Sequence, residues 1–83
     1  MKTYYAGHNG YGTNVSYRSM GWWVKRFDTK KARDKWVDDN LVNEQGNTVA
    51  EPITRKTAQI ILGAGEWVEF QDWLINKKND PRN

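Results

Sequence analysis

The chain has 83 residues, a formal net charge of +3 and no cysteine. The length fits one domain, since domains run from about 50 to 250 residues. The lack of cysteine excludes a disulfide framework and a thiolate metal site. Leu, Ile, Val and Phe supply only 15 residues for a hydrophobic core. The five Trp and four Tyr add to it, because each buries about 150–250 Å² of surface. We expect one compact domain over residues 1–76 and a flexible tail over residues 77–83.

The charge and the apolar runs limit where the protein acts. The longest uninterrupted apolar stretch, residues 60–65, is too short to span a bilayer. We therefore expect no membrane contact and, given the missing cysteines, a cytoplasmic location. The acidic and basic residues are mixed along the chain, so the balance permits nucleic acid without requiring it.

The first third of the chain predicts a β-hairpin. Residues 2–7, KTYYAG, and residues 21–27, GWWVKRF, both have the composition of strands. The segment between them, residues 10–20, is polar and rich in glycine. We expect two paired strands with a long, irregular connection.

Residues 6–14, AGHNGYGTN, combine three glycines with His8, the only histidine. The glycine spacing matches neither the dinucleotide fingerprint nor a P-loop, and no helix follows, so the phosphate-binding context is missing. Asn9-Gly10 is a turn signal. A turn or irregular connection is the favoured interpretation, and a binding loop that presents His8, Tyr11 and Asn14 is the alternative.

Two helices are predicted further along. Residues 27–42 carry Ala32, Trp36, Val37 and Leu41 on one face, with Asp28 as the N-cap. Residues 53–63 form a second helix. Thr54 is its N-cap, Ile53 packs on Ala58, and Gly63 ends it.

The remaining segments complete the predicted fold. Residues 47–52 predict a third short strand. Residues 66–76 suit either a strand or a helix, and the spacing of Trp67, Phe70 and Leu74 favours a helix. The sum is an α+β fold, with a small antiparallel sheet of about three strands packed against two or three short helices on one face.

Both predicted helices begin with basic residues, which is opposite to what the helix dipole favours. These residues are Lys30, Lys31, Arg33, Arg55 and Lys56. Lys25 and Arg26 stand just upstream of the first helix, so positive potential is expected to gather there. A local rule broken twice in the same sense suggests function. The alternative is that these side chains are solvated and paired, for example Lys30 with Asp34.

The adjacent tryptophans Trp22 and Trp23 lie in one predicted strand, so their side chains point to opposite faces. One of them is expected in the core. The other is either covered as well, or an exposed anchor for a protein partner, or a platform for a nucleobase.

Two segments carry a resemblance. Residues 21–40, GWWVKRFDTKKARDKWVDDN, and residues 51–63, EPITRKTAQIILG, resemble small proteins encoded by bacteriophages and prophages, the group from which anti-CRISPR proteins are drawn. The resemblance implies a small cytoplasmic protein of an infected or lysogenic bacterium that acts by binding. Many anti-CRISPR proteins are acidic mimics of DNA, and this chain departs from them by its positive charge.

We therefore expect a non-enzymatic, phage-type protein that binds and sterically inhibits a host protein complex, for example as an anti-CRISPR on a CRISPR-Cas effector. The alternative is a small basic nucleic-acid-binding module. No catalytic residue, metal site or cofactor is expected, since His8 has no visible partner and no metal-ligand spacing occurs. The candidate partner-binding residues are Tyr11, Trp22, Trp23, Lys25, Arg26, Lys30, Lys31 and Arg33.

Overall fold

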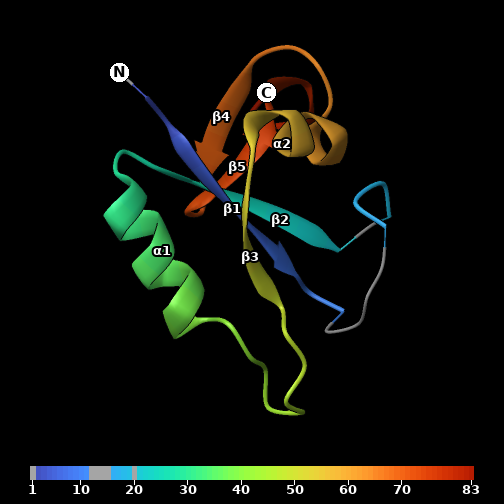
Figure 1. Ribbon diagram of the computed structural model, residues 1–83. Coiled ribbons are helices and arrows are strands. Elements are labelled where there is room, and N and C mark those ends of the chain that lie inside the picture. The colour runs from blue at the N-terminus through green and yellow to red at the C-terminus, as the bar shows by residue number, and fades with distance from the viewer. Residues whose placement is uncertain (1, 12–15, 20) are drawn as a thin grey trace.

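The computed structural model describes residues 2–11, 16–19 and 21–83, and the described residues form five strands and two α-helices (Figure 1). In chain order the elements are β1 (Tyr4–Asn9), β2 (Trp22–Phe27), α1 (Lys30–Asp39), β3 (Ala50–Ile53), α2 (Arg55–Leu62), β4 (Trp67–Phe70), β5 (Trp73–Asn76) and the short 3₁₀ helix η1 (Lys77–Asn79). The α+β class is confirmed.

The five strands make one antiparallel sheet in the order β3-β1-β2-β5-β4. The predicted hairpin of the first two strands is present, with Gly7 of β1 opposite Val24 of β2. Val24 is in turn opposite Leu74 of β5, so β2 joins the two halves of the sheet. The sheet therefore has five strands where the sequence predicts about three.

The helix predicted over residues 66–76 is wrong, because this segment forms the hairpin of β4 and β5. Gln71 and Asp72 both have positive φ, 51° and 70°. That backbone makes a two-residue turn whose twist matches paired strands. Glu69 lies opposite Leu74 across this hairpin, and Trp67 lies two residues before Glu69, so Trp67 and Leu74 point to the same face of the sheet. The spacing of these apolar residues therefore does not require a helix.

The two helices cover opposite faces of the sheet, which corrects the expectation that they share one face. Tyr5 packs in a cluster with Ala58 of α2, whereas its neighbour Ala6 packs in a cluster with Val37 of α1. Successive strand residues point to opposite faces. Figure 1 shows the two helices well separated. The chain therefore builds two small cores, one on each side of the sheet.

The larger core lies between α2 and the sheet. Its buried residues are Tyr5, Val24, Ile53, Ala58 and Leu74. The core on the α1 side is smaller, with Ala6, Val37 and Ala50 buried and Phe27 and Trp36 packed against them. Val24, which is 0% exposed, is the largest fully buried side chain among the described residues.

Threonine side chains cap both helices. The hydroxyl of Thr29, not the carboxylate of Asp28 as predicted, accepts the bond from the Ala32 N–H at 3.1 Å. Thr54 caps α2 as predicted, by accepting from the Thr57 N–H at 3.2 Å. Gly63 ends α2 at φ 88°. The third strand, β3, begins at Ala50 and not at Asn47.

The C-terminal residues lie against β4. The Arg82 guanidinium donates to the Glu69 carbonyl oxygen at 3.1 Å and lies 5.4 Å from the Phe70 ring. The same guanidinium pairs with Asp80 at 2.9 Å. Neither described helix is long and apolar enough to cross a bilayer.

Truncation of Val24 tests the core. Val24→Ala should lower the free energy of unfolding by about 2 kcal/mol, because it leaves a cavity where β2 meets β1 and β5. Val42→Ala is the matched control, since Val42 is 56% exposed, and it should change stability by less than about 0.5 kcal/mol. Urea denaturation of both variants measures the difference, and equal losses would contradict this account of the core.

Candidate functional site

A cavity of about 420 Å³ lies at the end of the sheet where β1 begins and β3 ends. Lys2, Thr3, Tyr4 and Tyr5 line it from β1 and the residues before it, and Ile53 lines it from the end of β3. The first turn of each helix completes the wall, with Lys30 and Arg33 from α1 and Thr54 and Arg55 from α2. We call it the basic cavity, because its lining holds four cations and no carboxylate.

Arg33 fixes α1 to this cavity. Its side chain is only 12% exposed, and its Nε pairs with Asp34 at 2.8 Å. Its Nη1 donates to the Tyr5 carbonyl oxygen at 3.3 Å, and its guanidinium lies 5.5 Å from the Tyr4 ring centroid. The start of α1 is therefore held against the first residues of β1.

Arg55 fixes α2 to the same place. Its Nη1 donates to the Tyr5 hydroxyl oxygen at 2.8 Å, and its guanidinium lies 4.7 Å from the Trp67 ring centroid. A guanidinium over an indole face gains a cation–π attraction. Tyr5 thus accepts one hydrogen bond from an arginine of each helix.

The positive charge of the basic cavity is only partly compensated. Among the described residues, no carboxylate forms an ion pair with Lys2, Lys30 or Arg55. The predicted alternative pairing of Lys30 with Asp34 is not found, because Asp34 pairs with Arg33. Like charges gathered around one hollow repel one another, so an anion bound there would relieve that repulsion.

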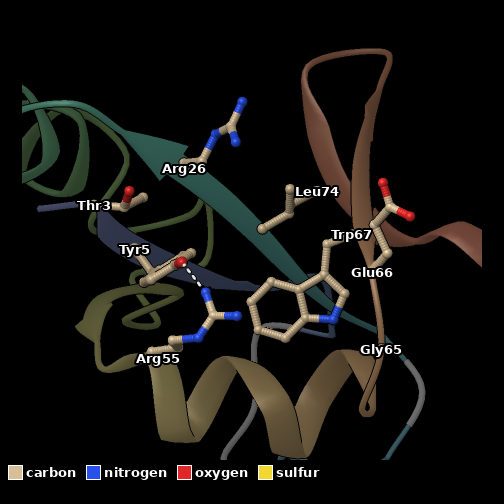
Figure 2. Close-up of a pocket in the computed structure, with 8 residues that line it drawn as sticks. All are labelled: Thr3, Tyr5, Arg26, Arg55, Gly65, Glu66, Trp67 and Leu74. Carbon is tan, nitrogen blue, oxygen red and sulfur yellow. Dashed lines mark hydrogen bonds between the residues drawn. The ribbon is translucent and has the colours of Figure 1, made fainter. Parts of the chain in front are cut away.

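A second cavity of about 260 Å³ adjoins the first on the α2 side of the sheet (Figure 2). It shares three lining residues with the basic cavity, namely Thr3, Tyr5 and Arg55. The others are Arg26, Gly65, Glu66, Trp67 and Leu74. We call it the Trp67 cavity. Figure 2 shows the Arg55 guanidinium between the Tyr5 hydroxyl and the Trp67 indole. Arg55 lines both cavities, which therefore adjoin at this residue.

The Trp67 indole is held in place by its neighbours. Its Nε1 donates to the Gly63 carbonyl oxygen at 2.9 Å, and its ring meets the Tyr5 ring edge to face at 6.1 Å. The Asn76 side chain donates to the carbonyls of Leu62 and Ala64, which fixes the segment between α2 and β4. The ring is therefore oriented before any ligand arrives.

The predicted partner-binding residues do not form one surface. Trp22 and Arg26 point to the α2 side of the sheet, and Trp23 and Lys25 point to the α1 side. Of the pair, Trp23 is the exposed tryptophan, at 47%, whereas Trp22 is half-buried and packs on Tyr17. The candidate residues of β2 are therefore divided between the two faces of the sheet, as the alternation of Trp22 and Trp23 in one strand predicts.

The predicted cations also differ in their surroundings. Lys30 and Arg33 line the basic cavity, whereas Lys31 is exposed outside it. Arg26 lines the Trp67 cavity and pairs with Glu69 at 2.7 Å. Lys25 donates to the Asp72 carbonyl oxygen and lies 5.7 Å from the Trp73 ring.

The glycine-rich segment over residues 6–14 is partly strand. Its first residues belong to β1, and Asn9 accepts from the Tyr11 N–H through its side chain at 3.0 Å, which opens the turn. Tyr11 is 58% exposed, and a side chain at Gly21 would collide with its ring. The prediction for Asn14 falls outside the described residues.

His8 lies on the α1 side among aromatic rings and not in a loop. Its ring centroid is 6.2 Å from that of Trp36 and 5.9 Å from that of Trp73. Burial lowers the pKa of His8 from its ordinary value of 6.5. Within the described part of the chain, no three His, Asp or Glu side chains are arranged to hold a metal ion.

Sequence reasoning did not identify Lys2, Tyr5, Arg55 and Trp67 as site residues, although all of them line the two cavities. Lys2 and Tyr5 were assigned only to a strand, and Trp67 was assigned to a helix. The signal for Arg55 was present, because a basic residue directly after the N-cap is unfavourable for the helix dipole. Its neighbours across the cavity are distant in sequence, so only the fold brings them together.

Comparisons of the chain with protein-family models, with curated proteins and with solved structures found no match.

Removal of one hydroxyl tests the contact between α2 and β1. Tyr5→Phe keeps the buried ring and removes the acceptor for Arg55, so it should lower the free energy of unfolding by about 1 kcal/mol. Tyr4→Phe is the matched control and should change stability little, as no hydrogen bond of the Tyr4 hydroxyl occurs among the described residues. Urea denaturation of both measures the difference, and equal effects would contradict the role of Tyr5.

The lowered pKa of His8 predicts a pH dependence of stability. The unfolded chain binds the proton more readily than the folded chain, so the free energy of unfolding should fall as the pH drops below about 6.5. His8→Gln should show a smaller fall between about pH 7.5 and pH 5. Urea denaturation at both pH values tests this, and an unchanged pH dependence in the variant would refute it.

Proposed function

We propose that this protein binds single-stranded nucleic acid and that the basic cavity holds backbone phosphates. One observation carries the proposal: four cations, from both helices and from the segment before β1, line one hollow, and no acidic residue lines it. Phosphate oxygens bind lysine as a point charge and arginine as a two-pronged donor, and this lining offers both.

The shape of the site favours a single strand over a duplex. A duplex is bound by a helix or ribbon that enters a groove, whereas here the cations surround a hollow closed by both helix starts. Single strands are bound by cations along the backbone together with aromatic rings near the bases. Tyr4 supplies such a ring, with Lys2 and Arg33 at 5.6 and 5.5 Å from its centroid.

A second candidate function is docking to a host protein, as the phage-type resemblance implies. It is favoured by Trp23, which is 47% exposed and lies 5.7 Å from the Trp73 ring on the α1 side. Exposed tryptophans beside cations are common anchors of protein interfaces, and Lys25 stands next to Trp73. This surface lies on the sheet face opposite the Trp67 cavity, so the two candidates can be tested by separate variants.

Charge reversal in the basic cavity tests the proposed function. Binding of a fluorescent single-stranded oligonucleotide should weaken steeply as salt rises from about 50 to 200 mM. Lys30→Glu should weaken binding of all sequences alike and lower the slope of log K against log salt by about one. Fluorescence anisotropy across the salt series measures both effects.

Lys78→Glu is the control for overall charge, since Lys78 is exposed in η1 and lines neither cavity. It should keep most of the affinity and the slope. Equal losses of affinity in the two variants would mean that the net charge of the protein, and not the basic cavity, accounts for binding. Absence of any binding at about 50 mM salt would reject the proposal and leave the Trp23 surface as the candidate.

A further inference from the structure

The two cavities differ in charge although they share a wall. In the basic cavity, no carboxylate among the described residues pairs with Lys2, Lys30 or Arg55. In the Trp67 cavity, Arg26 is already neutralised by Glu69 at 2.7 Å, and the lining also holds the Glu66 carboxylate, which pairs with Lys77 at 3.3 Å. A phosphate is therefore attracted to the first cavity and gains much less in the second.

We propose that the Trp67 cavity receives one unstacked nucleobase of the strand whose phosphates occupy the basic cavity. The inference rests on the proposed function and adds to it a base-binding position. A nucleobase is flat and uncharged and carries hydrogen-bonding groups on its edge. The site therefore needs a ring surface and polar groups at the rim, without excess charge.

The lining of the Trp67 cavity meets these needs. The Trp67 indole is fixed by its bond to the Gly63 carbonyl oxygen, and the Arg55 guanidinium lies over its ring at 4.7 Å, so ring and guanidinium together supply the flat surface for a base. The Glu66 carboxylate is 68% exposed at the rim, and Figure 2 shows it beside Trp67. Its Oε2 pairs with the Lys77 ammonium at 3.3 Å, so its other oxygen is the one that can accept from an amino group of a base. The volume of about 260 Å³ is below the range of about 300–1,000 Å³ for whole small-molecule ligands. It suits one base more than a complete nucleotide.

Arg55 connects the two positions. It lines both cavities, and its guanidinium is held between the Tyr5 hydroxyl and the Trp67 ring. One edge of a guanidinium can meet a phosphate while its plane lies against a ring. A nucleotide unit that spans from base to phosphate would therefore pass over Arg55.

Removal of the base from the ligand gives the first test. A short oligonucleotide in which every base is replaced by an abasic site keeps its phosphates and loses only the ring. The intact oligonucleotide should bind the wild-type protein about tenfold more tightly than the abasic one. The salt slope should be the same for both, because it counts phosphate contacts. Equal affinities would overturn the base position and leave the proposed function standing.

Two protein variants should separate the two positions. Trp67→Leu should reduce the preference for the intact strand over the abasic strand to less than about threefold, with the salt slope unchanged. Lys30→Glu should lower the slope and keep the preference. Circular dichroism establishes that each variant is folded. If Trp67→Leu does not fold, quenching of a 2-aminopurine base in the oligonucleotide by the wild-type protein replaces it, and an unquenched base would overturn the inference.

A free nucleotide also carries a base and a phosphate, so it is the other ligand that the two cavities could bind. Adenosine monophosphate should bind at least about 100-fold more weakly than the oligonucleotide, because it presents one phosphate to a cavity with four cations. Equal affinity for the mononucleotide would overturn the assignment to a strand. If neither oligonucleotide binds at low salt, the proposed function fails, and the base position fails with it.

Discussion

Tyr5 is the residue on which the arrangement of both helices depends. Its ring is buried in the α2-side core, its carbonyl oxygen accepts from Arg33 of α1, and its hydroxyl oxygen accepts from Arg55 of α2. A hydrogen bond to a charged group contributes more than one between two neutral groups. The two contacts hold both helix starts at one end of the sheet, and the basic cavity is the space between them.

The same arrangement explains a charge pattern that is unfavourable within each helix. Basic residues in a first turn oppose the helix dipole, and Lys30, Arg33 and Arg55 occupy such positions. Two of these three side chains form contacts with β1 or β4 that offset part of that cost. Lys30 has no such contact among the described residues, so nothing in that part of the chain offsets the cost of its position.

The sheet edges show how so small a domain limits unwanted strand pairing. Pro52 lies in the edge strand β3 and has no N–H to offer a neighbouring strand. At the other edge, the Arg82 guanidinium donates a hydrogen bond to the Glu69 carbonyl oxygen of β4, so that oxygen is already bonded and not offered to a neighbouring strand. The open surface around Trp23 lies on a face of the sheet and not on its edge, so a partner there would meet side chains and not backbone.

The sequence by itself determined the elements whose signals are local. Thr54 and Gly63 marked the ends of α2. The strand of Trp22 and Trp23 lies where the sequence predicts it. The two indoles point to opposite faces because side chains alternate along a strand. The local signal was ambiguous at β4 and β5, since apolar residues three and four apart suit a helix as well as two strands joined at a turn.

Only the tertiary structure decided which faces the helices cover and which cations meet. Residues 5, 33 and 55 are far apart in the chain, and their contacts follow from the sheet order and from the burial of Tyr5. No periodicity records such long-range pairings, because they depend on how whole elements pack. The basic helix starts were visible in the sequence, whereas the hollow they share exists only because Tyr5 brings both of them to β1.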